Sequence, residues 1–341
     1  MKSYIPILSL LSLGLLCCSN PAERAQDLLK VGNEHLSRGE LAKAEDYYNQ
    51  AITEFPEFPH ALNNLGIIRF KQQRYYLALE LYDKAIALKP DFPDAYLNRS
   101  AALYEIGLFE SSLRDIEIVE EITPDTFHIN FRKGLIYTQL KKYDSAINYF
   151  SLAITYRSDN PELWTNRGTV YYYKNQLNRA ISDLTKALNL DTTFSPALNS
   201  IALVYLRKGN LDSAEINIKR ALMLQPKDSY YLNNYGLIVF RKGDINSALK
   251  LINQSIVINP DNGWAYRNKA LVYLEQKDYN RALQLFYEAS IRGGSVESLF
   301  SFWADAFYRS GDLKSACKKL DEARERNEDF AFLAWQSECI N

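Results

Sequence analysis

Asparagine recurs along the chain at intervals of 34 residues or twice that, at Asn64, Asn98, Asn166, Asn234 and Asn268. An asparagine side chain offers two N–H donors and an acceptor oxygen, which match the polar groups of a peptide bond. A row of such amides on one surface could therefore hold the backbone of an extended peptide. The alternative is that these asparagines only help a helix to begin and to pack.

Aromatic residues follow several of these asparagines six positions later, at Phe70, Tyr104, Tyr172 and Phe240. Large rings beside a row of amides could grip the apolar side chains of a ligand. Aromatic residues at helical spacing also fill hydrophobic cores, and this second interpretation stays open. The neighbouring charges are mixed, with basic Arg132, Arg207, Arg241, Arg267 and Arg309 and acidic Asp94, Glu105, Glu162 and Glu275.

Signals of catalysis, metal binding and cofactor binding are missing from the sequence. The chain has only three histidines, no two of them at metal-ligand spacing, and it contains no C-x-x-C pair. It also lacks the glycine-rich phosphate loops and the G-x-S-x-G nucleophile motif. We therefore expect no enzyme activity, no cofactor and no metal site.

Small residues also repeat every 34 positions, in three columns that run through the whole chain. Stepping from Gly66 gives nine small residues, from Gly32 to Ala304, and stepping from Ala78 gives nine more, from Ala44 to Ala316. The third column runs from Ala51 to Ala323 and is broken only by Val119. Nine repeats of 34 residues thus stay in phase over residues 25–330 without an insertion.

These columns predict two helices in each repeat, which we call helix A and helix B. Small residues at repeat positions 8, 20 and 27 let the two helices approach closely, while large residues at positions 4, 11 and 24 fill the space beside them. Glycine or a polar residue near position 15 ends helix A, and proline at position 32 follows helix B in several repeats. One such hairpin cannot bury its apolar face alone, so the hairpins must stack.

The pattern resembles the tetratricopeptide repeat (TPR) family over about nine tenths of the chain. The resemblance implies an all-α fold, a right-handed α-solenoid of about nine helical hairpins, with a protein or extended peptide as the partner in its concave groove. The asparagine column is similar to the ladder in the TPR region of O-GlcNAc transferases. The carboxylate clamp of chaperone-binding TPR domains is absent, because Leu29 and Asp94 stand where it needs lysines.

Two parts of the repeat array depart from the pattern. Repeat three has Ser100, Ser112 and Val119 in the small-residue columns, so we expect a looser junction near residues 93–126. After the ninth repeat, residues 331–341 contain Phe332, Leu333 and Trp335, which predict a short capping helix. We favour burial of these rings over a self-association surface.

The N-terminus resembles a bacterial lipoprotein signal. The apolar run from Ile5 to Leu16 is too short to span a bilayer, and it leads to Cys17 and Cys18. Leu15 precedes Cys18 by three residues, so residues 1–17 are the expected signal, Cys18 the lipidation site and 18–24 a linker. An ordinary signal peptide with incidental cysteines is the alternative. The absence of Asp after Cys18 favours the outer membrane over the inner one.

The net charge and the cysteine content bear on the class of partner and on disulfide bonding. The formal net charge is −1, so no basic excess points to nucleic acid. With residues 1–17 removed and Cys18 lipidated, only Cys317 and Cys339 remain as possible thiols, and the sequence leaves open whether they pair. We expect a non-catalytic binding scaffold lipid-anchored in the bacterial cell envelope, similar to TPR lipoproteins that help to assemble pili or outer-membrane machines. The alternative is a regulatory or adaptor subunit of an envelope enzyme such as a peptidoglycan hydrolase.

Overall fold

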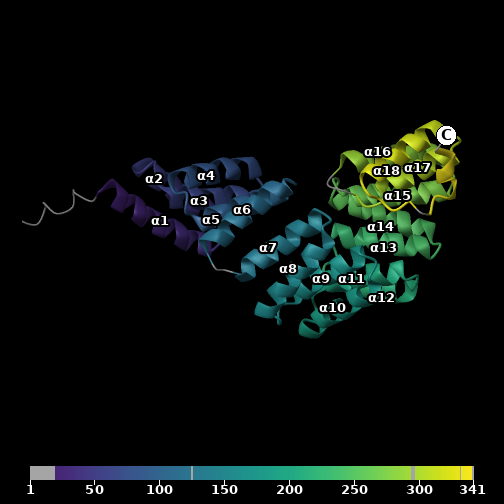
Figure 1. The fold of residues 1–341 in the computed structure, drawn as a ribbon, viewed down its shortest axis with the longest axis horizontal. Helices are drawn as coiled ribbons and strands as arrows, with labels where there is room; N and C mark the ends of the chain where they lie inside the picture. Colours follow the sequence, from purple (N-terminus) through teal and green to yellow (C-terminus); the bar gives the residue numbers. More distant parts are fainter. Residues whose placement is uncertain (1–19, 124–125, 293–295, 331, 340–341) are drawn as a thin grey trace, which may run out of the picture. The chain divides into compact units, whose positions relative to one another are not determined.

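The computed structural model describes residues 20–123, 126–292, 296–330 and 332–339, and these contain helices but no strands. The chain divides into two compact units, Met1–Tyr156 and Arg157–Asn341 (Figure 1). In each unit consecutive helices pack against one another as antiparallel pairs. The prediction of an all-α solenoid of helical hairpins is therefore confirmed within each unit.

Unit 1 holds the first four hairpins. Each pair consists of a helix A and the helix B that follows it: α1 (Pro21–Ser37), α2 (Leu41–Glu54), α3 (Pro59–Lys71), α4 (Tyr75–Leu88), α5 (Pro93–Glu105), α6 (Phe109–Ile122), α7 (Thr126–Gln139) and α8 (Tyr143–Tyr156).

Unit 2 holds five hairpins and a final 3-10 turn. Its elements are α9 (Pro161–Tyr173), α10 (Leu177–Leu190), α11 (Ser195–Arg207), α12 (Leu211–Leu224), α13 (Ser229–Arg241), α14 (Ile245–Ile258), α15 (Gly263–Glu275), α16 (Tyr279–Ile291), α17 (Leu299–Arg309), α18 (Leu313–Glu325) and η1 (Ala334–Cys339).

The close approach inside a hairpin depends on the small residue at position 8. Gly66 of α3 faces the buried ring of Tyr82 on α4, and a Cβ on Gly66 would lie only 2.5 Å from Tyr82 Cε1. Gly168 of α9 meets the smaller Leu184 of α10 in the same way. The large residue at position 24 thus fills the room that the missing side chain leaves.

The turn between helix A and helix B has a left-handed residue at position 15. Gly107 adopts φ +80° there, and Lys141 adopts φ +56° in the next hairpin. Glycine takes this conformation without steric cost, whereas a lysine is constrained in it. The expected turn after helix A is therefore present, with glycine at position 15 in some hairpins and a polar residue in others.

Repeat three is not loosened within its helix pair. Ser100 Oγ on α5 lies 2.8 Å from Ser112 Oγ on α6, and Ser112 Oγ donates to the Ser100 carbonyl at 2.8 Å. Both serines are buried, so these hydrogen bonds replace the usual contact of small apolar residues. Residues 124–125 lie outside the described residues, so the expectation of a looser junction near residues 93–126 stays a prediction, while the two compact units divide after Tyr156.

The two ends of the chain differ in detail from the sequence-based expectation. The predicted signal segment and Cys18 lie outside the described residues and stay predictions. The linker is shorter than predicted, because Asn20 caps α1 and Pro21 already begins the helix. At the other end, residues 334–339 form the short 3-10 helix η1, with Leu333 and Trp335 buried and Phe332 half exposed.

Candidate functional site

The asparagine column in unit 1 ties neighbouring hairpins together. Asn98 Nδ2 donates to Asn63 Oδ1 at 3.0 Å, and Asn64 Nδ2 donates to Asn33 Oδ1 at 2.7 Å. Asn63 Nδ2 donates in turn to Asn64 Oδ1 at 3.1 Å. These amides therefore use part of their hydrogen-bonding capacity on each other. Only the remaining part of that capacity is left for a ligand.

The same linkage recurs in unit 2, where Asn234 Nδ2 donates to Asn199 Oδ1 at 2.8 Å and Asn268 Nδ2 to Asn233 Oδ1 at 2.9 Å. Asn268 is only 1% exposed and accepts from Arg267 as well. The prediction that Asn268 contacts a ligand is corrected, because burial removes it from the groove surface. Asn166 is half-buried on α9 and makes no side-chain hydrogen bond within the described ranges.

The aromatic residues of unit 1 brace each helix A against its own helix B. Phe70 and Tyr75 meet edge to face with ring centroids 5.4 Å apart, and Tyr104 and Phe109 do the same at 5.4 Å. Tyr104 Oη also accepts a hydrogen bond from Gln139 at 3.0 Å, and burial raises the pKa of Tyr104. The structure thus places Phe70 and Tyr104 in hairpin packing.

Tyr172 of unit 2 is covered by an arginine. The Arg207 guanidinium carbon lies 3.9 Å from the centre of the Tyr172 ring, and Arg207 Nη1 donates to the Tyr172 carbonyl at 3.0 Å. Burial raises the pKa of Tyr172 to about 12. A ring stacked under a guanidinium in this way is not free to grip a ligand.

Glu297 joins distant repeats of unit 2, and sequence reasoning missed it. Arg207 Nη2 lies 2.9 Å from Glu297 Oε1, and Arg267 Nη1 donates to the Glu297 carbonyl at 2.6 Å. Arg267 is only 8% exposed, and this burial lowers its pKa. Two of the arginines predicted to line the groove are therefore held by the chain itself. The 34-residue pattern carries no signal for this contact, because Glu297 lies just before a helix.

A pocket of about 450 Å³ lies at the C-terminal end of unit 2. Helices α13, α15 and α17, which are neighbours in the stack, supply most of its wall (Figure 1). Its lining combines apolar and charged side chains: Phe240, Ile245, Leu271, Leu274, Phe302, Phe332, Arg241, Glu275, Asp305 and Arg309, together with Gly243. Phe240 is the one aromatic residue of the predicted site found here, and the predicted groove charges Arg241, Glu275 and Arg309 lie here with it. We call this site the C-terminal pocket.

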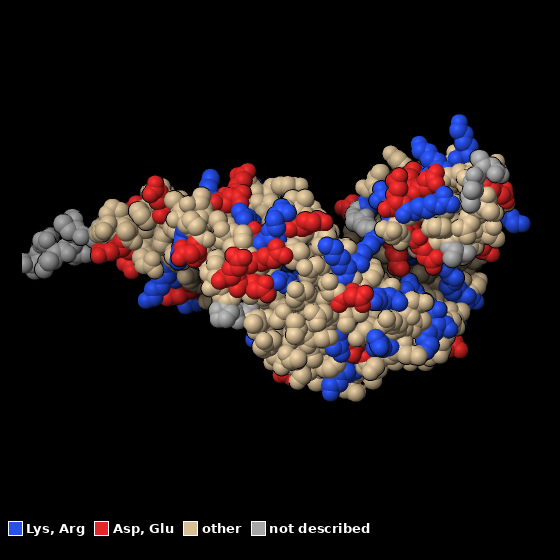
Figure 2. Space-filling view, in the orientation of Figure 1, with Lys and Arg blue, Asp and Glu red and all other residues tan. Residues whose placement is uncertain are grey.

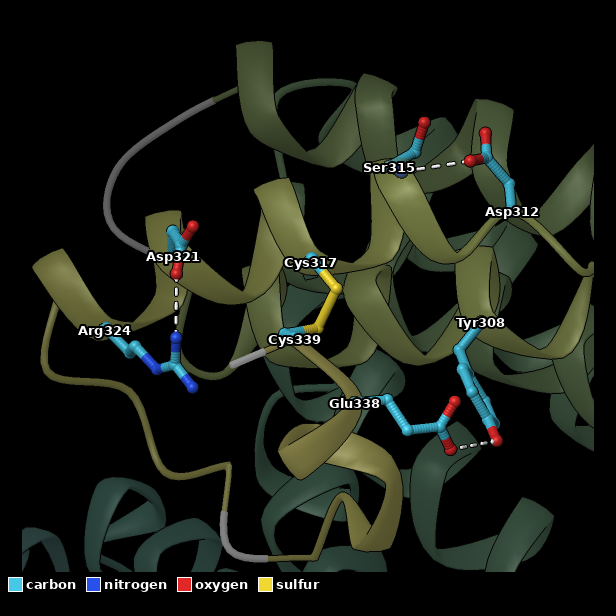
Figure 3. Close-up of a disulfide and its surroundings, with 8 residues drawn as sticks. All are labelled: Tyr308, Asp312, Ser315, Cys317, Asp321, Arg324, Glu338 and Cys339. Atoms are coloured by element: carbon cyan, nitrogen blue, oxygen red, sulfur yellow. Dashed lines mark hydrogen bonds and ion pairs between the residues drawn. A yellow bond between two sulfur atoms is a disulfide. The ribbon is translucent and has the colours of Figure 1, made fainter. Parts of the chain in front are cut away.

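Residues 332–339, which we call the tail, form part of the pocket wall through Phe332. A disulfide joins Cys339 of the tail to Cys317 of α18, and Tyr308 Oη donates to Glu338 at 2.9 Å (Figure 3). Trp335 stacks on the Tyr308 ring at 4.5 Å and donates to Asp305 at 3.2 Å. The disulfide settles the pairing that the sequence left open, and the pocket has a fixed wall.

The described residues contain no group of three or more histidine, cysteine or acidic side chains placed to hold a metal ion. None of the helices in the described ranges combines the length and the apolar character needed to cross a membrane.

Four family models match the sequence, all for tetratricopeptide repeats. Two described as "Tetratricopeptide repeat" match residues 29–95 with 199–263 and residues 251–284, a third of that description matches 161–194, and one described as "TPR repeat" matches 134–173. Together they cover more than half of the chain and fall on the hairpins described above. The chain belongs to the tetratricopeptide repeat family.

Similar proteins support the fold of this TPR protein. PilF of Pseudomonas aeruginosa is 19% identical, with a TM-score of 0.53, over 62% of this chain and 97% of that one. Cut9-Hcn1 from the APC/C hetero-tetramer is 18% identical, with a TM-score of 0.61, over 89% of this chain and 59% of that one. At these identities the likeness concerns the fold alone.

The curated relatives match only a short segment. The photosystem I assembly protein Ycf3 of Rippkaea orientalis is 41% identical over 49 residues, and that of Dioscorea elephantipes is 43% identical over 49 residues. Each match covers 14% of this chain and 28% of the relative. Tetratricopeptide repeats typically serve as non-catalytic scaffolds for protein interactions.

Proposed function

We propose that this TPR protein binds an extended segment of a partner protein at the C-terminal pocket while a lipid on Cys18 anchors it to a bacterial envelope membrane, with the outer membrane favoured. The observation that carries the binding site is the pocket itself, where apolar walls and two rim charges without ion pairs lie together. Neither the Arg241 nor the Glu275 side chain makes a hydrogen bond or ion pair within the described residues. A volume of about 450 Å³ accommodates side chains of a partner and not a folded domain.

The tether is supported by the sequence around Cys18 and by the early start of α1. Since Pro21 is already helical, residues 19 and 20 alone separate the proposed anchor from the first capped helix. Two extended residues reach at most about 7 Å. The first hairpin is thereby expected to stay beside the lipid surface. The short match to Ycf3, which is named as a photosystem I assembly protein, is compatible with a role of this chain in assembling a complex.

Crosslinking in native membranes followed by purification and mass spectrometry tests the binding function. The wild type is compared with Arg241→Ala/Glu275→Ala, which changes two exposed rim residues, and with Glu80→Ala/Lys84→Ala, a matched exposed pair on α4. We expect the rim variant alone to lose a partner set. A wild type that enriches no partner over an unrelated lipoprotein would contradict the scaffold function. A captured enzyme whose rate changes with this chain would favour the adaptor alternative.

Membrane fractionation tests the anchor separately. We expect Cys18→Ser to move the protein from the membrane to the soluble fraction, and Cys17→Ser to leave most of it in the membrane. An unchanged distribution of Cys18→Ser would sink the lipid anchor without affecting the binding proposal.

A further inference from the structure

The rim of the C-terminal pocket carries alternating charges at one repeat position. Position 13 is Arg241 on α13, Glu275 on α15 and Arg309 on α17. Figure 2 shows acidic and basic side chains intermingled over this end of unit 2. The rim is thus not a patch of one sign, and it favours a ligand with charges of both signs.

The three rim residues differ in whether the protein itself supplies hydrogen-bond or ion-pair partners for their side chains. Arg309 Nε lies 2.7 Å from Asp305 Oδ2, and the other oxygen of Asp305 accepts from Trp335 at 3.2 Å. Asp305 is therefore fully engaged, while the terminal nitrogens of Arg309 remain available. Arg241 and Glu275 have no such partner within the described part of unit 2. The rim offers two sets of cationic donors with one carboxylate between them.

The spacing of the helices sets the spacing of a complementary ligand. Packed helices lie about 8–10 Å apart, and a peptide in the polyproline II conformation advances about 3.1 Å per residue with three residues per turn, so every third side chain lies on the same face. One repeat therefore corresponds to about three ligand residues. A segment with the pattern acidic-x-x-basic-x-x-acidic places one opposite charge at each rim residue, in either chain direction.

The apolar floor determines what the residues between those charges must be. Phe240, Leu271 and Leu274 line the pocket from two neighbouring helices, and Phe302 and Phe332 close it with rings 5.1 Å apart. Phe332 is 50% exposed although the disulfide-held tail fixes its place, so a large apolar surface faces the pocket without a covering group. Insertion of one large apolar side chain would bury that surface.

We propose that the C-terminal pocket binds an internal, extended segment of a partner protein with acidic, basic and acidic residues at every third position and a large apolar side chain between the first two. This rests on the proposed function and specifies its ligand. The Phe332 wall distinguishes the site from the groove formed by repeats alone, because the tail lies outside the 34-residue pattern.

Fluorescence anisotropy with defined peptides tests this proposal on the purified full-length chain. The probe is the blocked, labelled nonapeptide Gly-Glu-Ala-Phe-Lys-Ala-Ala-Glu-Gly. The controls are its charge-inverted form with lysine and glutamate exchanged and its Phe→Ser form. We expect the probe to bind at least about tenfold more tightly than the serine form, since burial of one phenyl ring gives that difference. The charge-inverted peptide should also bind more weakly.

Exchange of the rim charges provides the decisive variant. Arg241→Glu/Glu275→Arg/Arg309→Glu should reverse the preference between the probe and its charge-inverted form, which a misfolded protein cannot do. Phe332→Ala should weaken both peptides, while Tyr76→Ala, a ring of unit 1, should leave both unchanged. Absence of binding, or a preference that the exchange leaves unaltered, would overturn the proposal. If the rim variant still loses its native partners, the scaffold function stands without this ligand pattern.

Discussion

Units 1 and 2 consist of the same kind of helical hairpin, but their aromatic side chains have different surroundings. In unit 1 the aromatic residues Phe70 and Tyr104, which the sequence suggested as ligand contacts, pack within their own hairpins. In unit 2 the side chains of Phe240 and Phe302 face a pocket instead. The difference arises from the tail and its disulfide, which add a wall beyond the last repeat. The regular repeats thus form the scaffold, and the tail beyond the last repeat completes the candidate site.

The largest expected effect comes from emptying the core of one unit. Tyr82→Ala in unit 1 and Phe286→Ala in unit 2 each remove a fully buried ring, which should cost about 3–5 kcal/mol of unfolding free energy. Because repeats contact mainly their neighbours, the damage should stay in the unit that carries the change. Hydrogen exchange read by mass spectrometry checks this. Equal loss of protection in both units would show that they unfold as one.

Removal of the disulfide tests the wall that only unit 2 has. Cys317→Ser/Cys339→Ser opens a loop of 22 residues in sequence, for which chain entropy predicts a loss of about 3 kcal/mol. Urea unfolding of the oxidised wild type against this variant measures the loss. Exchange protection in α1–α8 should not change. A variant as stable as the wild type would mean that Trp335 and Leu333 hold the tail unaided.

The hydrogen bonds of Asn268 and Asn98 differ in burial, because Asn268 is buried and Asn98 is half-buried. Asn268→Ala leaves Asn233 Oδ1 without its donor and Arg267 Nε and Nη2 without their acceptor, so we expect a loss of about 1–3 kcal/mol. Asn98→Ala in unit 1 should cost less, about 0.5–1.5 kcal/mol, since Asn98 is half-buried and its removal leaves no buried guanidinium without an acceptor. Denaturant midpoints of the two variants give the comparison. A larger loss for Asn98→Ala would reverse this ranking.

The smallest expected effect concerns an acidic residue at repeat position 21. Hydrogen bonds from Lys219 and Lys242 lower the pKa of Glu215 to about 2, and Arg69 lowers that of Glu45 in unit 1. A depressed carboxyl pKa stabilises the fold above the unfolded value near 4.5, and the contribution disappears as the pH falls toward 2. Stability of Glu215→Gln against the wild type should therefore differ above pH 5 and converge in acid. A difference that grows in acid would contradict the assignment.

The sequence predicts the hairpins well because each depends on local spacing of small and large residues. Gly66 facing Tyr82 follows from the 34-residue columns alone. The site is less predictable, because Arg207 pairs with Glu297 across 90 residues of sequence, and periodicity says nothing about such a contact. Phe332 and Cys339 likewise lie beyond the last repeat, where the 34-residue pattern gives no prediction. Of the pocket residues, Phe240 and the charged Arg241, Glu275 and Arg309 were candidates from the sequence, whereas the other lining residues were not.

A site-specific photocrosslinker tests the central claim, that unit 2 presents the binding site through its tail. Benzoylphenylalanine would replace Phe332 in one variant and Tyr76, which is 72% exposed on α4, in another, both expressed in native membranes. We predict a distinct crosslinked partner from position 332, lost on rim charge exchange, and none from position 76. Partner capture from position 76 with none from position 332 would contradict the account.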